Sequence, residues 1–310
     1  MLVRQMRPDD LEQVRNVGQK AWSKLASEEV GHKVKYPFRP RKIINGYLWK
    51  EPKGCLVVED DGKVIASAHC HVWGRVGWFG PFEVHPEMQG KGVGKALLSG
   101  CENYLTRSGC THFGLETMPY IMKNVHFYLH AGYRPQQFTC IMEKQLCERQ
   151  EPPHGIDRID ERDLGTVLPE ISAISHLYHL DLDLSREVEM VVREGLGALF
   201  VSRSDEKLAG FGVLHTFHPI EESDHSAVRL LLVDPHQVDA ADHFDRLMRS
   251  LENQSLLLDR RRMFVRFTVT PLLYEEMRRR DYVLEGSNMR MVKGPGYSEK
   301  EGFIMASWAG

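Results

Sequence analysis

The hydrophobic positions of this chain alternate between short runs of period two and longer stretches of helical spacing. In the first half the period-two runs predict six strands, centred on Val3, Val57, Ala68, Phe82, Gly114 and Cys140. Helical spacing predicts helices over Leu11 to Leu25, Gly92 to Ser108 and Val125 to Ala131. The fold class that follows is α/β, with a mixed, mainly antiparallel twisted sheet flanked by helices.

The same order of elements occurs a second time along the chain. The strand, turn and strand that begin at Gly54 resemble in pattern those that begin at Gly197. Three further pairs keep a constant offset of 149 residues: Val84-His85-Pro86 with Val233-Asp234-Pro235, Tyr133 with Tyr282, and Met142 with Met291. We infer two tandem copies of one unit, residues 1–148 and 155–293, joined by a polar, proline-bearing connection and followed by a tail, 294–310.

Composition and length agree with two ordinary globular domains. The chain has 310 residues, 42% hydrophobic and 27% charged, and a single core seldom serves more than about 250 residues. No apolar run approaches the roughly 20 residues that span a bilayer. The first ten residues also lack the apolar core of a secretory signal. We therefore expect a cytoplasmic protein without a membrane segment.

Charge and cysteine usage exclude two further classes. The net charge of -3 gives no basic field for a nucleic acid. The six cysteines form no CxxC pair and lie in apolar surroundings, which favours reduced core thiols over disulfides or zinc. No metal site is predicted.

A glycine-rich segment, Gln89 to Lys95, follows a strand and opens a helix. A Walker A loop would need glycine at Gln89 and Ser or Thr at Ala96. A dinucleotide fingerprint would need a glycine at Lys95 or a small residue at Leu97, depending on its starting glycine. Both motifs are excluded. The alternatives left are a different pyrophosphate loop and a glycine turn without a ligand.

The spacing of Gln89, Gly92 and Gly94, after the Val-His-Pro strand end, resembles the coenzyme A loop of the GCN5-related N-acetyltransferase (GNAT) superfamily. The resemblance covers residues 1 to 145 in element order. It implies that acetyl-CoA is the acetyl donor and that backbone amides wrap its pyrophosphate, with the cofactor-binding residues Gln89, Gly90, Lys91, Gly92, Val93, Gly94 and Lys95. It also implies that the edge of strand Phe82 to Val84 pairs with the pantetheine.

A second segment carries the same resemblance. Asn124 and Tyr128 are four residues apart, so both side chains lie on one face of a helix. The run from Asn124 to Tyr133 resembles the fourth helix of the family. This implies that Asn124 contacts the cofactor and that Tyr128 is catalytic, as the acid that protonates the departing thiolate. The alternative for Tyr128 is a core tyrosine near a helix end.

The sequence leaves the general base open. Glu83, in the strand predicted to bind the cofactor, is the catalytic candidate that we name. His69 and His71 share one strand face with Ser67. They are either part of a polar substrate wall or surface histidines on a half-exposed strand. A water molecule is a further candidate for the general base. His85 belongs to the strand end and is predicted to be structural.

The segment from Ser27 to Pro52 corresponds to the acceptor wall of acetyltransferases of this type. Basic residues alternate there with aromatic ones: Lys33, Lys35, Arg39, Arg41 and Lys42 with Tyr36, Phe38, Tyr47 and Trp49. This bias suits an anionic acceptor, although a solvated basic surface is the simpler interpretation. The resemblance implies direct acetyl transfer, in a ternary complex, to a primary amine of a small molecule or peptide. The rival function is a non-catalytic acyl-CoA sensor or scaffold. The sequence is compatible with either a monomer or an oligomer.

The second copy lacks the residues that this chemistry needs. With the offset of 149, residues 238–243 replace the glycine loop with Val-Asp-Ala-Ala-Asp-His, and Met277 replaces Tyr128. Two acidic residues stand where a pyrophosphate would lie. We predict a degenerate GNAT-like domain, and we expect the apolar tail segment from Gly302 to Trp308 to dock as a strand.

Overall fold

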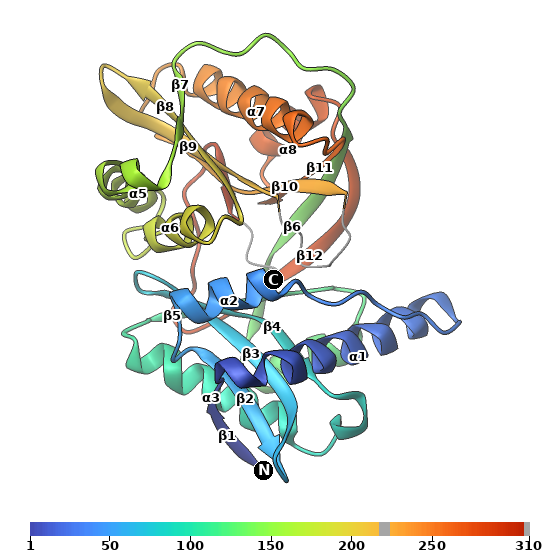
Figure 1. The fold of residues 1–310 in the computed structure, drawn as a ribbon. Coiled ribbons are helices and arrows are strands. Elements are labelled where there is room, and N and C mark those ends of the chain that lie inside the picture. The colour runs from blue at the N-terminus through green and yellow to red at the C-terminus, as the bar shows by residue number, and fades with distance from the viewer. Residues whose placement is uncertain (217–223, 307–310) are drawn as a thin grey trace.

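The structure, a computed structural model, describes residues 1–216 and 224–306 and consists of two halves with the same order of elements (Figure 1). The first half contains β1 Leu2–Gln5, η1 Pro8–Asp10, α1 Leu11–Val30, α2 Arg41–Lys50, β2 Cys55–Asp60, β3 Lys63–Trp73, β4 Val76–Val84, η2 Pro86–Met88, α3 Val93–Arg107, β5 His112–Thr117, α4 Met122–His130 and β6 Arg134–Gln145. All six predicted strand centres lie inside strands, so the α/β prediction is confirmed. None of the described helices is both long and apolar enough to cross a bilayer.

The second half repeats this order and adds one strand. It contains β7 Ile156–Ile159, η3 Glu161–Asp163, α5 Leu164–Tyr178, α6 Ser185–Arg193, β8 Gly197–Ser204, β9 Lys207–His215, β10 His225–Val233, α7 Ala240–Leu257, β11 Arg262–Thr268, α8 Pro271–Arg279, β12 Val283–Lys293 and β13 Ile304–Ala306. The tail therefore does form a strand, as expected. Trp308, the end of the predicted segment, lies outside the described residues.

Helix boundaries differ from the predicted ones where capping decides them. The first helix continues five residues past Leu25 and ends at Gly31, which takes the left-handed conformation (φ 74°) that closes many helices. The hydroxyl of Ser27 also accepts a hydrogen bond from the Val34 amide (2.8 Å), which ties the following loop to the last turn. The α4 helix starts three residues before Val125. Helix ends set by backbone conformation in this way leave little hydrophobic signal in the sequence.

The two halves exchange their last strands. The sheet order is β1-β2-β3-β4-β5-β12-β6-β11-β10-β9-β8-β7, so β12 of the second half pairs with β5 of the first half. In return β6 of the first half pairs with β11 of the second. In Figure 1 β6 and β12 run side by side between the halves. One continuous sheet therefore joins the two copies, and each copy needs the other to complete its sheet.

A shared hydrophobic core reinforces this connection. Side chains of α1 and α2 pack in one cluster with those of α5 and α6, including Ile44, Tyr47, Leu182 and Val188. The opposite face of each half has a core of its own, under α3 and α4 in the first half and under α7 and α8 in the second. The sheet thus has one face that meets the other half and one face that carries its own helices.

A buried ion pair crosses the shared core. Lys50 of α2 pairs with Glu187 of α6, and Glu187 also accepts a hydrogen bond from the Trp73 indole (2.8 Å). The ammonium of Lys50 further contacts His71 Nδ1 at 2.7 Å. Burial opposes ionisation of Glu187, yet Lys50 and His71 hold the pKa of this carboxyl well below its usual value. The Glu187 carboxyl is therefore ionised in the core that the two halves share.

Replacing Lys50 with methionine should lower the free energy of unfolding by about 3–5 kcal/mol, because it leaves the Glu187 carboxylate buried without its cation. Urea denaturation measures this loss. The double variant Lys50→Met/Glu187→Leu should recover part of it, since no unpaired charge then remains. Lys53→Met, at an exposed position, is the matched control. A single Lys50 variant as stable as the wild type would show that the pair contributes nothing.

Candidate active site

The glycine loop has the conformation that only glycine adopts without strain. Gly90 and Gly92 have φ of 79° and 82°, and a Cβ on either would meet no atom within 4 Å. The loop is therefore open on the side where these residues lack side chains. The side-chain amide of Gln89 donates to the Val84 carbonyl (3.2 Å) and so ties the loop to the end of β4.

Backbone amides are free from Gly90 to Lys95, whereas the Gln89 amide donates to the Pro86 carbonyl (3.4 Å). The N–H groups of residues 90–95 donate to no acceptor among the described residues, and the first amide that does so is that of Ala96, to Gly92 O (3.1 Å). Val93 begins α3, so the positive end of the helix dipole lies at the same place. Free amides at a helix N-terminus form a binding site for phosphate groups. The predicted pyrophosphate site therefore has the donors that it needs.

An open strand edge lies next to this loop. β4 pairs with β5 over only three residues, from Val76 to Trp78, and then diverges from it. From Phe79 to Val84 the edge that faces away from β3 has no strand partner among the described residues. An unpaired edge can accept an extended ligand as an added strand. The predicted pantetheine edge, Phe82 to Val84, belongs to this stretch.

The α4 helix brings Tyr128 toward the same edge, and Asn124 lies half-buried one turn earlier on this helix. The Tyr128 ring packs at 6.3 Å from the rings of both Phe79 and Phe82, measured between centroids. A Cβ on Gly94 would lie 3.4 Å from Phe127, so the start of α3 also rests on α4. The loop, the strand edge and the helix therefore meet at one place.

Tyr128 is buried, and no described residue hydrogen-bonds to its hydroxyl. Burial raises the pKa of Tyr128, so the hydroxyl keeps its proton at neutral pH. A protonated, unpartnered hydroxyl beside the open edge is able to donate a proton to a bound ligand. Tyr128 is thus a core tyrosine with a free polar atom, and its role as the acid stays a prediction.

Glu83 points to the other face of the sheet. Its neighbours Phe82 and Val84 pack toward α3 and α4, whereas its carboxylate lies against α1, where a Cβ on Gly18 would be 2.7 Å from Oε2. The indole of Trp22 and the guanidinium of Arg39 both donate to Oε1, each at 2.9 Å. No described residue donates to Oε2. One oxygen of this buried carboxylate is thus held, and the other is available.

A narrow pocket opens beside this carboxylate. Its wall comes from α1, from the loop that precedes α2 and from β4, and it includes Val14, Gly18, Trp22, Tyr36, Arg39 and Glu83. The rings of Trp22 and Tyr36 stack at 5.5 Å. No sequence motif marks Trp22, and Tyr36 and Arg39 belong to the basic, aromatic segment Ser27 to Pro52 without any local feature that distinguishes them. Their role depends on a loop that folds back onto β4, and local sequence does not reveal such a contact.

The two strand histidines are not surface residues, so that interpretation of His69 and His71 is wrong. Both are buried, since β3 is covered on this face by α2 and by the second half. Burial, with the nearby charge of Arg39, holds the pKa of His69 well below its usual value, and burial also lowers the pKa of His71. His71 Nε2 contacts the Gly80 carbonyl at 2.8 Å. Both imidazoles are therefore neutral core groups on the same sheet face as Glu83.

Three buried polar atoms beside Glu83 have no hydrogen-bond partner among the described residues. They are Ser67 Oγ, His69 Nε2 and Arg39 Nη1. Ser67 lies directly opposite Glu83 in the pairing of β3 with β4. Buried polar atoms are nearly always satisfied by protein, water or ligand. Their grouping marks this sheet face as a place for a polar ligand or for bound water.

The basic segment before α2 divides into two parts. Lys33, Lys35, Arg41 and Lys42 are exposed, as a solvated surface requires. Arg39 is the exception, because it is buried and paired with Glu83. His85 serves its strand end as predicted, since its Nδ1 accepts a hydrogen bond from the Glu87 amide (3.3 Å).

The cysteines are all free thiols, and five of the six are buried. Cys147, in the connection between the halves, is exposed and departs from the predicted core position.

One group of described side chains, His112, His179 and Asp181, has ligand atoms within 4.8 Å of one another. His112 Nε2 contacts Asp181 Oδ2 at 3.0 Å, and the Asp181 amide donates to His179 Nδ1. These contacts attach β5 to the loop after α5.

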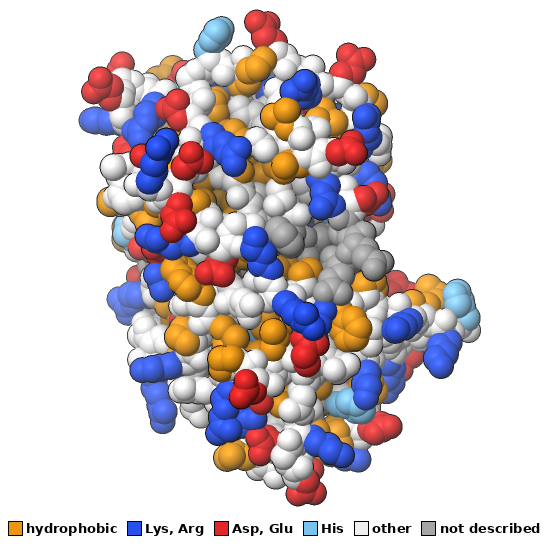
Figure 2. All heavy atoms as spheres, in the orientation of Figure 1, with side chains coloured by type: hydrophobic (Ala, Val, Ile, Leu, Met, Phe, Trp, Pro, Cys, Tyr) orange, Lys and Arg blue, Asp and Glu red, His pale blue; other side chains and the backbone are white. Residues whose placement is uncertain are grey.

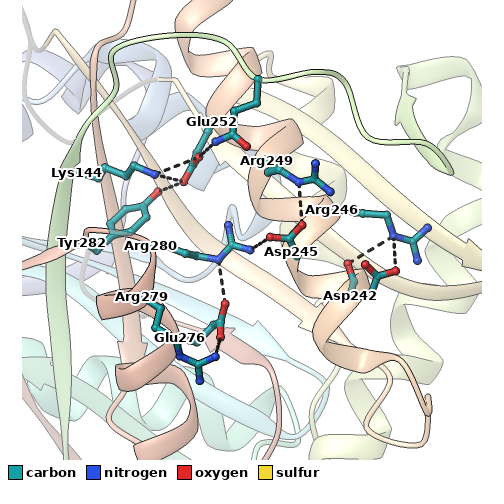
Figure 3. Close-up of polar contacts among 11 residues, drawn as sticks. Lys144, Asp242, Asp245, Arg246, Arg249, Glu252, Glu276, Arg279, Arg280 and Tyr282 are labelled. Atoms are coloured by element: carbon teal, nitrogen blue, oxygen red, sulfur yellow. Dashed lines mark hydrogen bonds and ion pairs between the residues drawn. The ribbon is translucent and has the colours of Figure 1, made fainter.

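Two amides of the corresponding loop in the second half are already hydrogen-bonded. The amides of Asp242 and His243 both donate to the Asp239 carbonyl, at 2.9 and 3.1 Å. Met277 stands in place of Tyr128 and is fully buried. Figure 3 shows that ion pairs also connect the helices here, with Arg280 between Asp245 of α7 and Glu276 of α8. The run of six consecutive free amides and the hydroxyl of the first half have no counterpart at these positions among the described residues.

The tail fills the strand gap of the second half. β10 and β11 diverge after Val228, as β4 and β5 do after Trp78. β13 pairs antiparallel with β10 over Leu230 to Leu232, which corresponds to the edge that stays open in the first half. The Val233 amide also donates to the Phe303 carbonyl (3.0 Å). A segment of the chain itself thus occupies this edge.

Two parallel strands that diverge beside a glycine loop, next to a helix that carries a tyrosine hydroxyl, are typical of the acetyltransferase class of α/β proteins. Residues 19–133 match the model of the acetyltransferase (GNAT) family. An acetyltransferase of Sodalis glossinidius is 30% identical over 112 residues, which are 36% of this chain and 79% of that protein. An uncharacterized N-acetyltransferase of Methanocaldococcus jannaschii is 27% identical over 142 residues, 44% of this chain and 80% of that protein. The chain belongs to the GNAT family.

Solved structures extend the likeness of fold to both halves. A proposed acetyltransferase from Pyrococcus horikoshii has a TM-score of 0.73 at 15% identity, covering 99% of this chain and 94% of that one. A tandem GNAT protein from the clavulanic acid biosynthesis pathway has a TM-score of 0.57 at 13% identity, covering 96% and 99%. The tandem GNAT architecture predicted from the repeat is therefore confirmed as a fold.

Proposed function

We propose that this protein is an acetyl-CoA-dependent N-acetyltransferase that acetylates a primary amine of a small molecule or peptide. Acetyl-CoA binding belongs to residues 1–148, residues 155–293 form a degenerate GNAT-like domain, and the tail 294–310 closes the second cleft. One observation carries the proposal: six consecutive free amides adjoin an open strand edge and a protonated tyrosine. The amides fit the pyrophosphate, the strand edge fits the pantetheine, and the tyrosine hydroxyl fits the departing thiolate.

The binding residues follow from that fit. The backbone amides from Gly90 to Lys95 hold the pyrophosphate, Gln89 ties this loop to β4 through its side chain, and Lys91 and Lys95 add positive charge at the exposed side. The Phe82 and Val84 backbone pairs with the pantetheine amides, and Asn124 donates from α4. The bound thioester supplies an activated acetyl group.

Catalysis then requires alignment and two proton movements. The amine nitrogen forms a bond to the acetyl carbon, and the bond from that carbon to sulfur breaks. The backbone amide at Val84 polarises the carbonyl oxygen, and Tyr128 donates its proton to the leaving sulfur. Oε2 of Glu83 takes the amine proton through a water molecule in the adjoining pocket. His69 and His71 are less suitable bases, because burial disfavours their protonated forms.

The rival function is a non-catalytic acyl-CoA sensor or scaffold. Such a protein needs the loop and the strand edge but not a free acid. The unpartnered Tyr128 hydroxyl and the available Glu83 oxygen favour the enzyme. A cytoplasmic location is part of the proposal, since it suits six free thiols.

A panel of primary amines incubated with the full-length protein and acetyl-CoA should include substrates that release coenzyme A. The reason is that direct transfer frees one thiol for each amide formed. Colour development with a thiol reagent measures the rate, and mass spectrometry of the amine identifies the acetylated product. Tight acetyl-CoA binding without release, across amino acids, aminoglycosides, polyamines and peptides, would favour the sensor.

A further inference from the structure

Two arginines of the second half lie at the junction without a partner. Arg229 of β10 and Arg266 of β11 are half-buried, and neither forms a hydrogen bond or ion pair with any described residue. Nearly every other buried cation here is paired. Arg290, for example, is fully buried between Glu116 and Glu299. A half-buried guanidinium without an anion is costly, which calls for an explanation.

Their places in the sheet direct both side chains toward the first half. On β11 Val265 and Phe267 pack under α7, so the intervening Arg266 lies on the opposite face, which meets the first half. Arg229 stands at an irregularity in the pairing of β9 with β10, where Val228 and Leu230 face opposite cores. A bulge of this kind redirects a side chain, and bulges are common next to active sites.

The charges of the two guanidinium groups act on residues that surround Glu83. Burial raises the pKa of Tyr47, while the charges of Arg39 and Arg229 oppose that rise. Burial raises the pKa of Tyr36 in the same way, against Arg39 and Arg266. Tyr36 lines the pocket beside Glu83. In Figure 2 lysine and arginine side chains lie on both sides of the line where the halves meet.

The carboxylates in range are already engaged. Glu116 and Glu187 act on Arg229, but Glu116 bonds to Arg290 and Glu187 to Lys50. Burial and the neighbouring Arg229 lower the pKa of Arg266 to about 10, so the group is charged at neutral pH in spite of its surroundings. An anion from outside the chain would relieve this repulsion.

We propose that Arg229 and Arg266 bind an anionic group, a carboxylate or phosphate, on the amine that the first half acetylates. The acceptor would lie between the two halves, with its amine near Glu83 and its anion against the second half. The inference rests on the proposed function for the identity of the ligand as an acceptor. It gives the degenerate half a task, which is to select the substrate.

Kinetics with matched amines test the acceptor role. The pairs are phosphoethanolamine with ethanolamine, and β-alanine with its amide, so that one arm reports on phosphate and the other on carboxylate. Arg229→Gln and Arg266→Gln should raise KM for the preferred anionic amine about 10- to 100-fold, the range of a lost charged hydrogen bond. KM for the neutral member and for acetyl-CoA should not change. Equal losses for both members of a pair would overturn the proposal.

Arg278→Gln is the matched control, because Arg278 is exposed on α8 and outside the junction. Without ligand, Arg229→Gln and Arg266→Gln should melt at the wild-type temperature or above it, since each removes an unpaired charge. A clear fall in Tm would show instead that the arginines are structural, and this too would overturn the proposal.

Anion binding is measured separately from turnover. With saturating coenzyme A on the glycine loop, inorganic phosphate or acetate should raise Tm of the wild type and of Arg278→Gln, but not of the two junction variants. If no amine is acetylated and this shift still depends on Arg229 and Arg266, the anion site stands and the proposed function fails. If neither anion gives such a shift, the site is overturned whatever the turnover.

Discussion

Replacing Tyr128 with phenylalanine should lower kcat by about 10²- to 10⁴-fold while acetyl-CoA affinity stays unchanged. The substitution removes one oxygen from a buried aromatic cluster, so the packing against Phe79 and Phe82 is kept. What disappears is the proton that the leaving sulfur needs, and a positioned acid typically contributes this much to a rate. Single-turnover measurements at saturating acetyl-CoA isolate the chemical step.

Tyr133→Phe is a matched control for that substitution. Tyr133 is buried in the same cluster, 6.2 Å from the Tyr128 ring, and it loses the same atom. Its variant should turn over like the wild type, as should Met277→Leu in the second half.

Burial also raises the pKa of Tyr128 above its ordinary value of 10.0, so the wild-type rate should show no loss of this acid below that pH. A Tyr128→Phe enzyme with full single-turnover rate would make Tyr128 a packing residue only.

Local signals in the sequence account for the cofactor side of the site. The glycines at 90 and 92 are needed by their positive φ angles, and a pattern of three glycines before a helix reports such a loop directly. Asn124 and Tyr128 lie on one helix, where spacing alone decides which face they share. For this reason the loop and the shared helix face of Asn124 and Tyr128 could be predicted from local spacing, whereas the strand edge and the roles of these two residues followed from the family resemblance and stay predictions.

The acceptor side depends on contacts between distant segments. The burial of His69 and His71 comes from α2 and from the second half, so strand periodicity suggested a surface that does not exist. Arg39 has the same local sequence character as the exposed lysines near it, and only the fold pairs it with Glu83. The burial of these histidines and the pairing of Arg39 thus depend on segments that are far apart in the sequence.

The strand exchange was equally hidden, although the repeat itself was evident. A constant offset of 149 residues predicts two copies, but it is unchanged whether β6 completes its own sheet or that of its partner half. This choice matters for experiments. A fragment that begins at residue 155 lacks β6, which lies between β12 and β11, so the second half must be tested inside the full chain.

Substitution of Gly92 by aspartate should abolish the rise in Tm that acetyl-CoA gives to the full-length protein. Ligand at about 100 times its Kd stabilises the native state by about 2.7 kcal/mol, which differential scanning fluorimetry detects. A carboxylate at this position would stand among the free amides and repel the pyrophosphate.

Two controls separate charge from strain and the first loop from the second. Gly92→Asn places a neutral side chain of the same shape at φ 82°, a conformation that Asn and Asp both tolerate better than most residues. It should retain more of the acetyl-CoA shift than the aspartate variant. Ala241→Asp puts the same charge at the equivalent exposed position of the second half and should leave the shift intact, because the Asp242 and His243 amides there already donate to the Asp239 carbonyl. If instead Ala241→Asp removed the shift and Gly92→Asp kept it, acetyl-CoA would bind the second half, and the assignment of the two halves would have to be reversed.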